Sequence, residues 1–81
     1  MPYIPLYRRP DLTPKCSPPD NPGELNFQIT MLLKQFVARH GKSYNTFNAM
    51  SGAMHEAWAE FRRRIIVEYE AAKIMENGDV Y

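Results

Sequence analysis

The chain has 81 residues, of which ten are Lys or Arg and nine are Asp or Glu, so its formal net charge is only +1. A chain of this length forms one domain at most, and such a domain buries only about 60% of the surface that its unfolded chain would expose. The balanced charge excludes the strongly basic footprint of a general nucleic-acid-binding protein.

Two further features bear on the compartment. The chain has no run of about 18 consecutive apolar residues and no apolar core of a signal peptide near its start, so we expect a cytoplasmic protein without membrane contact. Its single cysteine, Cys16, cannot form an internal disulfide, which favours a reducing compartment. No basic cluster or helix start adjoins Cys16 to lower its pKa, and we treat this thiol as incidental rather than reactive.

Residues 1–21 are predicted to form an extended arm. All seven prolines fall in the first 22 residues, where they fix φ and remove backbone donors, so this stretch cannot be a long helix or a central strand. Its apolar content is higher than that of a disordered tail, which predicts an arm that lies against another surface. The apolar residues of the arm are Tyr3, Ile4, Leu6, Tyr7 and Leu12.

A first helix is predicted over residues 22–40. Asn21 is a good N-cap, Pro22 suits the first helical position, and Glu24 stands three residues after the cap, where it can complete a capping box. Apolar residues then recur at steps of three and four until Gly41 provides a C-terminal stop.

A second helix is predicted over residues 45–76, with Ser43 or Asn45 as its N-cap, so that the two helices form an antiparallel hairpin. Gly52 is its weak point. Small residues surround Gly52 on the helix surface. This favours a patch where another helix approaches closely, and it argues against the alternative, a break between two shorter helices. The apolar residues at helical spacing are Phe47, Met50, Met54, Ala57 or Trp58, Phe61, Ile65, Tyr69, Ala72 and Met75.

The two helices differ in length, and this difference predicts assembly. At 1.5 Å per residue the second helix is about 45 Å long and the first about 28 Å, so the last turns of the second helix overhang. Those turns carry more apolar surface than a monomer normally exposes. We therefore expect an all-α fold: an extended arm and an antiparallel hairpin with a long second helix, assembled as a homo-oligomeric bundle, a dimer or a higher even number. The interface candidates are Gly52, Trp58, Phe61, Ile65 and Tyr69.

The chain ends on "ENGDVY". Asn77 and Gly78 are expected to end the second helix through the left-handed backbone that glycine adopts freely, and Val80 or Tyr81 to fold back on the last turn as an apolar latch. The alternative is capture of this end by a backbone nest of a partner.

The sequence offers little for catalysis or metal binding. His40 and His55 are its only histidines, and no second histidine follows "HEAWA" at the spacing of zinc proteases. Phosphate loops, paired cysteines and nucleophile elbows are absent from the sequence. We expect a non-enzymatic protein that needs no metal or cofactor.

The arginines suggest a ligand site. In "RRR", Arg62 to Arg64, successive residues turn by about 100°, so the three cannot all point one way. Glu60 with Arg64, and Arg64 with Glu68, suit ordinary surface pairing, and Arg62 lies one turn after Trp58 and can stack on it. The sharper alternative is a cationic pocket with aromatic walls, as used for phosphates and bases. Its candidate residues are Arg8, Arg9, Arg62 and Arg63 with Tyr3, Tyr7, Tyr69 or Trp58.

The chain also resembles a set of short proteins encoded mainly by bacteriophages and prophages. The resemblance rests on "MPYI" followed by "RRPDL", on "GELNFQIT", "YNTFNAMSG" and "EFRRRIIVEYEAAK", and on the closing "ENGDVY", and it omits only the stretch "TPKCSPPD". It implies a phage-encoded protein that works in a bacterial cytoplasm, and it implies no activity.

Two functional hypotheses follow. The first is a homo-oligomeric binding module that captures a small anionic, nucleotide-like ligand, with counter-defence as its role. The second is an interaction protein that docks on a host or phage protein through its arm and its C-terminal latch.

Overall fold

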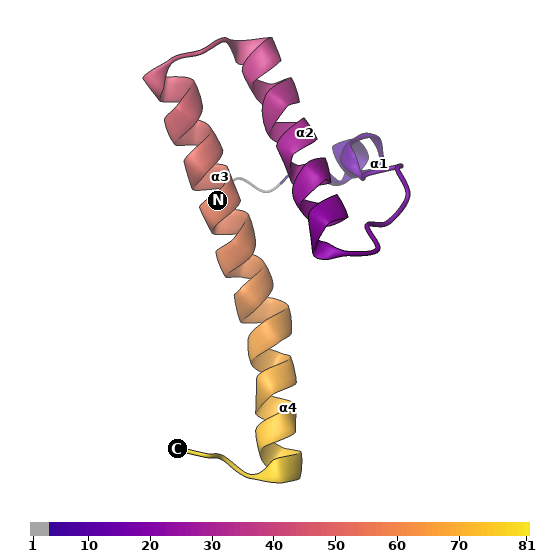
Figure 1. The fold of residues 1–81 in the computed structure, drawn as a ribbon, viewed down its shortest axis with the longest axis vertical. Helices are drawn as coiled ribbons and strands as arrows, with labels where there is room; N and C mark the ends of the chain where they lie inside the picture. The colour runs from indigo at the N-terminus through magenta and orange to yellow at the C-terminus, as the bar shows by residue number, and fades with distance from the viewer. Residues whose placement is uncertain (1–3) are drawn as a thin grey trace. The chain divides into compact units, whose positions relative to one another are not determined.

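The computed structural model describes residues 4–81, and all regular structure in this range is helical (Figure 1). No strand occurs in the described range, which confirms the all-α class. The chain divides into unit 1, which ends at Phe47, and unit 2, Asn48–Tyr81, and each unit is described by itself. The hairpin and the assembly concern arrangements beyond one unit and stay predictions. The elements are η1 (Leu6–Arg8), α1 (Arg9–Leu12), α2 (Pro22–His40), α3 (Tyr44–Phe61), η2 (Arg62–Ile66) and α4 (Val67–Asn77).

The N-terminal arm of unit 1 is partly helical, so the prediction of an extended arm was wrong for residues 6–12. Pro10 lies in the first turn of α1, where its missing N–H breaks no helical hydrogen bond. The backbone N–H of Arg8 donates to the carbonyl of Pro5 at 3.0 Å, and that of Thr13 donates to the carbonyl of Arg9 at 2.9 Å. The hydroxyl of Thr13 also donates to the carbonyl of Arg9 and ends this short helix.

Helix α2 begins at the predicted cap. The side chain of Asn21 accepts from the backbone N–H of Glu24 at 2.8 Å, and the carboxylate of Glu24 accepts from the backbone N–H of Asp20 at 3.0 Å. The amide of Gln28 donates to the carbonyl of Ser17 at 2.9 Å and holds the preceding loop on the helix. Gly41, with φ of 83°, ends α2 in the left-handed region.

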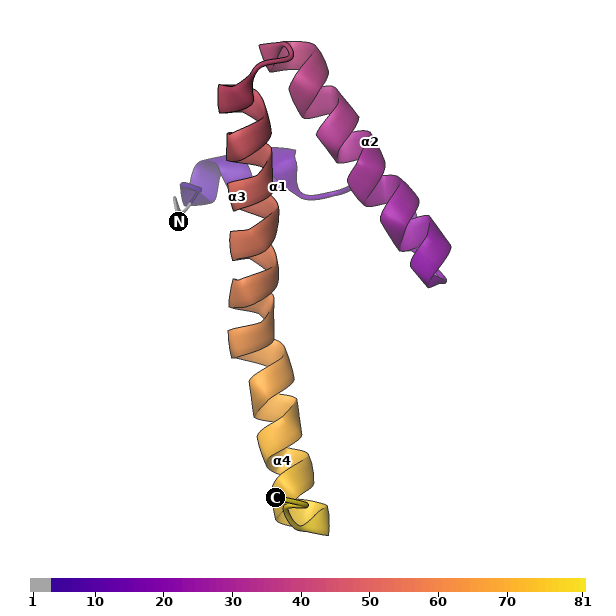
Figure 2. The same cartoon turned by 60° about the vertical axis from the view of Figure 1, so that its left-hand side comes forward.

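Ser43 is the N-cap of α3. Its hydroxyl accepts from the backbone N–H of Thr46 at 3.1 Å, and its carbonyl accepts from the N–H of Phe47 at 3.0 Å. Figures 1 and 2 both show the ribbon continuing without a break from α3 through η2 into α4. Gly52 lies inside α3, so the alternative of a broken helix is wrong.

The described residues have no hydrophobic core. Thr46 is the one buried residue among them, and every large apolar side chain keeps part of its surface in solvent. None of the helices in the described range is both long and apolar enough to cross a membrane. The fold therefore buries no apolar side chain of the described residues.

Replacing the N-cap of α2 tests the local basis of this fold. We expect Asn21→Ala to lower the free energy of unfolding by about 1 kcal/mol, because the N–H of Glu24 loses its acceptor. Urea denaturation followed by circular dichroism measures this change. Lys34→Ala, an exposed position in the middle of α2, is the control and should change little. Equal stability of both variants would contradict the role of the cap.

Candidate functional site

The predicted ligand residues fall in both units. Tyr7, Arg8 and Arg9 lie at the junction of η1 and α1 in unit 1, whereas Arg62, Arg63 and Tyr69 lie in unit 2. Tyr3 lies outside the described residues. The structure thus defines two separate arginine clusters, and a pocket that joins them stays a prediction.

The cluster in unit 1 consists of Tyr7, Arg8 and Arg9, which are consecutive in sequence. The Nε of Arg9 donates to the carbonyl of Ile4 at 2.9 Å, which fixes the side chain and leaves the two terminal nitrogens available. The guanidinium group of Arg8 makes no hydrogen bond or ion pair with any residue from 4 to 81, and Tyr7 is 79% exposed. Asp11 is the one acidic residue between positions 4 and 15, against three basic ones, so this stretch carries a local positive charge.

A hollow of about 530 Å³ lies in unit 1 between the loop that follows α1 and one face of α2. Its walls are mainly apolar, with Lys15 and two glutamine amides as polar groups. The lining residues are Leu12, Pro14, Lys15, Cys16, Phe27, Gln28, Met31, Leu32 and Gln35. Phe27 and Leu32 stay more than half exposed, so this hollow is open and does not replace a core.

The cluster in unit 2 is largely neutralised by glutamate. The carboxylate of Glu60 accepts from the guanidinium groups of both Arg63 and Arg64, which are three and four residues further along the helix. The hydrogen bond from Arg64, reinforced by that from Arg63, holds the pKa of Glu60 below its ordinary value. For Arg63 and Arg64 the interpretation as a paired, solvated face is therefore the better one.

The aromatic residues of unit 2 pair with neighbours other than Arg62. Trp58 stacks on Phe61, with ring centroids 6.5 Å apart and an interplanar angle of 12°. Tyr69 lies below the ammonium of Lys73, whose Nζ is 5.6 Å from the ring centroid. The expected stacking of Arg62 on Trp58 is not found among the described residues.

The interface candidates of unit 2 are exposed. The exposed fractions of Trp58, Phe61, Ile65 and Tyr69 lie between 53% and 63%. A Cβ atom at Gly52 would meet no atom of unit 2 within 4 Å, so this position has room for a neighbouring helix. These residues are available for an interface, and the interface itself stays a prediction.

The C-terminal residues form the predicted stop but no latch. Gly78, with φ of 83°, ends α4, and its N–H donates to the carbonyl of Ile74 at 2.7 Å. Val80 is 91% exposed and Tyr81 is fully exposed, so the prediction that they pack on the last turn was wrong. The side chain of Asp79 accepts from the backbone N–H of Tyr81 at 2.8 Å and forms a local turn at this end.

One functional feature escaped the sequence analysis, namely the π-helical turn η2 at Arg62–Ile66. Its signal is present in "FRRRIIVEY", where the apolar residues Phe61, Ile65 and Tyr69 follow one another at two steps of four. In a regular α-helix two such steps rotate the side chain by about 80°, and an extra residue in the turn removes that drift.

No cluster of three or more metal-ligating side chains occurs within the described range. A family described as a domain of unknown function (DUF6899) matches residues 1–80. The chain belongs to this family. No curated protein and no solved structure matches it. The DUF6899 match extends over both units and names no activity. A phage origin and a function therefore stay proposals.

The ion pairs of Glu60 predict a pH dependence. Since its pKa is lowered in the folded chain, its contribution to stability is present above the pKa of an unfolded glutamate, about 4.3, and is lost as the pH falls through the folded value. We expect Glu60→Gln to lower the melting temperature by about 2 °C at pH 7 and by less at pH 3. Thermal melts followed by circular dichroism at both pH values check this, and Glu76→Gln, which alters one exposed pair near the helix end, is the control. An equal difference at both pH values would show that the ion pairs are not the cause.

Proposed function

We propose that this DUF6899 protein is a non-enzymatic binding module that works as an assembly of copies and holds a small anionic, nucleotide-like ligand. One observation carries the proposal. Although 44% of the residues are hydrophobic, no apolar side chain in the described range is buried. Exposed apolar surface of this extent marks an interaction site. A second copy of the chain is the partner that is always present at the same concentration.

The choice of an anionic ligand rests on the arm of unit 1. The guanidinium group offers a fork of donors that matches phosphate oxygens, and an aromatic ring beside it can stack on a base. Tyr7, Arg8 and Arg9 supply these groups within three consecutive residues, with Arg9 already fixed by its bond to Ile4. Symmetry of an assembly would repeat this cluster on each copy.

The arginines of unit 2 are poorer ligands for a free anion. Between residues 60 and 70 the three arginines are matched by three glutamates, Glu60, Glu68 and Glu70. An incoming phosphate would have to compete with these carboxylates. We therefore centre the ligand site on Arg8 and Arg9 and give Arg62 and Arg63 a lesser part in it.

The biological setting belongs to the same proposal. The resemblance to phage and prophage proteins supports a phage-encoded protein in the cytoplasm of a bacterial host. A module that sequesters a nucleotide signal there would serve counter-defence, because it removes the signal without chemistry.

A second candidate function is docking on a host or phage protein. The high exposure of Val80 and Tyr81 favours it, since exposed apolar side chains at the end of the chain are available to enter a groove of a partner. Purification of the tagged full chain from bacterial lysate, with Val80→Ser/Tyr81→Ser as control, tests this candidate. A stoichiometric partner that the control variant loses supports docking, and equal recovery by both chains rejects it.

The assembly is tested by sedimentation equilibrium. We expect a mass that is an even multiple of 9.4 kDa at micromolar concentrations and that decreases on dilution. The cause is that association covers the apolar side chains of unit 2. A single species of 9.4 kDa across the whole concentration range would reject the assembly.

The ligand is tested by calorimetry with mono-, di- and cyclic nucleotides. We expect at least one of them to bind, and Arg8→Ala/Arg9→Ala to weaken it by about a hundredfold, which is the loss expected for two charge-assisted contacts. Lys42→Ala, which removes a cation elsewhere in unit 1, is the matched control and should leave the affinity unchanged. Absence of heat and of any thermal shift with every nucleotide would reject the ligand and leave the assembly standing.

A further inference from the structure

The turn η2 changes the direction of every side chain that follows it. The backbone N–H of Val67 donates to the carbonyl of Arg62, five residues back, instead of to a carbonyl four residues back. Such a turn holds one more residue than an α-helical turn. Residues on either side of η2 that are eight apart in sequence therefore occupy positions that are seven apart in a regular helix, and they lie nearly in line.

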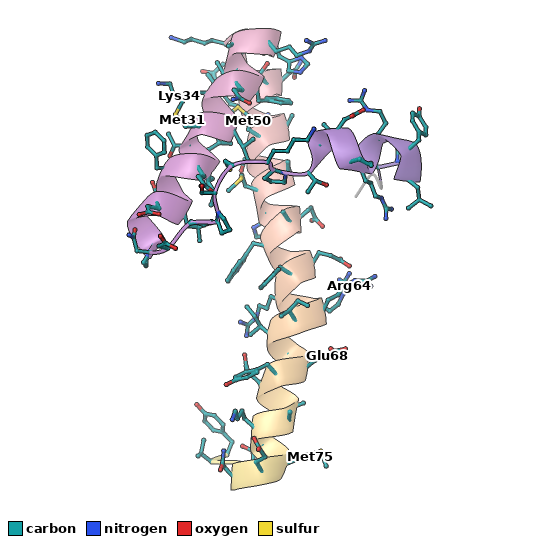
Figure 3. The ribbon with its side chains drawn as sticks, turned by 90° about the vertical axis from the view of Figure 1, so that its right-hand side faces the viewer. Met31, Lys34, Met50, Arg64, Glu68 and Met75 are labelled. Atoms are coloured by element: carbon teal, nitrogen blue, oxygen red, sulfur yellow. The ribbon has the colours of Figure 1, made fainter. Side chains whose placement is uncertain are left out.

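This extra residue keeps one apolar stripe continuous along unit 2. Before η2, apolar residues follow one another at alternating steps of four and three, and after it Tyr69 lies in line with Phe61. Without η2 the same two positions of the stripe would be taken by Arg64 and Glu68. Figure 3 shows Arg64 and Glu68 directed to one common side of the helix. The stripe consists of Met50, Met54, Ala57, Phe61, Ile65, Tyr69 and Ala72.

The stripe has no partner within unit 2. Met54, Phe61, Ile65 and Tyr69 are each between 41% and 63% exposed. A repeat of seven with apolar residues at alternating steps of four and three is the pattern with which helices pack side by side. The surface is therefore shaped to receive another helix that carries the same kind of stripe.

Charged residues flank the stripe in an order that selects the partner. Arg62 and Glu70 are eight residues apart across η2 and lie in line on one flank. Arg64 and Glu68 lie on the other flank, and both pairs are centred on Ile66. On each flank the cation comes before the centre and the carboxylate after it.

A two-fold, antiparallel pair of such helices places opposite charges side by side. If the axis passes near Ile66, the residue four before the centre on one copy lies beside the residue four after it on the other. Arg62 then faces Glu70 of the second copy, and Arg64 faces Glu68. A parallel, in-register pair would instead align the three arginines of one copy with those of the other, which is unfavourable.

We propose that the part of the stripe from Ala57 to Ala72 is the docking surface for the same segment of a second copy, packed antiparallel and centred on Ile66. This inference rests on the assembly part of the proposed function and specifies its geometry. Arg62 is the residue to test, because its guanidinium group makes no hydrogen bond or ion pair with the described residues, whereas the guanidinium group of Arg64 is already bonded to Glu60.

Charge reversal in sedimentation equilibrium is the deciding experiment. Arg62→Glu and Glu70→Arg each place like charges opposite one another, so each is expected to raise the dissociation constant at least tenfold. The double variant Arg62→Glu/Glu70→Arg restores the opposite order and should return the constant to within threefold of the wild type. Glu56→Arg, which reverses a charge at an exposed position of the same helix outside the stripe and its flanking pairs, is the control and should leave the constant within threefold.

A change of chain length provides a second readout. Deletion of Arg64 removes the extra residue, so a regular α-helix would keep the stripe continuous, and we expect association to persist with a higher melting temperature. Insertion of one alanine after Arg64 turns the two halves of the stripe by about 100° relative to each other and should weaken association at least tenfold. Loss of association on deletion, or its persistence on insertion, would overturn the proposed register.

The outcomes separate this inference from the function on which it rests. If the wild type assembles but the double reversal fails to recover the affinity lost in the single variants, the antiparallel pair is rejected and the assembly is retained. That result would leave the arm or another protein as the cover of the stripe. If the wild type is monomeric at every concentration, both the assembly and its geometry are rejected.

Discussion

The apolar stripe on the long helix of unit 2 is the constraint on which the rest of the molecule depends. A chain of 81 residues has little capacity to enclose a core, and here the described residues bury no apolar side chain. Caps, turns and ion pairs settle where the helices begin and end, but each such interaction contributes only about 1 kcal/mol or less. Most helical stability in proteins comes from packing of an amphipathic face, so the folded state of this chain depends on what covers the stripe.

The helix boundaries could be predicted because they depend on neighbours in sequence. Asn21 with Glu24, Ser43 with Thr46, and Gly41 and Gly78 each act within four residues, and the structure places a helix end at every one of them. The prediction of an extended arm was wrong for residues 6–12 because the prolines exclude only a long helix, whereas Pro10 lies in the first turn of the short helix α1, where proline is compatible with helix.

The candidate site was less predictable, because it depends on directions and on partners that a pattern does not give. The acidic partner of Arg63 and Arg64 was within reach of sequence spacing, and Glu60 was correctly paired with Arg64. The stacking of Trp58 on Phe61, and the turn made by Asp79 with Tyr81, were missed, because each needs a side-chain conformation that residue spacing does not fix. The spacing of the apolar residues indicates the π-helical turn, but it does not prove it, because steps of four are also tolerated in α-helices.

The distribution of charge assigns different tasks to the two units. Arg8 and Arg9 have little acidic compensation nearby, and Arg9 is held in place by the chain itself, which favours binding of an anion brought from outside. The arginines of η2 are embedded among glutamates at spacings that satisfy them within the chain or across a two-fold axis. A cluster that is neutral as a whole but ordered along a helix attracts a copy of itself more strongly than it attracts a phosphate, because the copy brings carboxylates in the matching order and also covers the stripe. The two proposals can therefore be tested separately, that of ligand binding through the arm and that of assembly through the residues around Ile66.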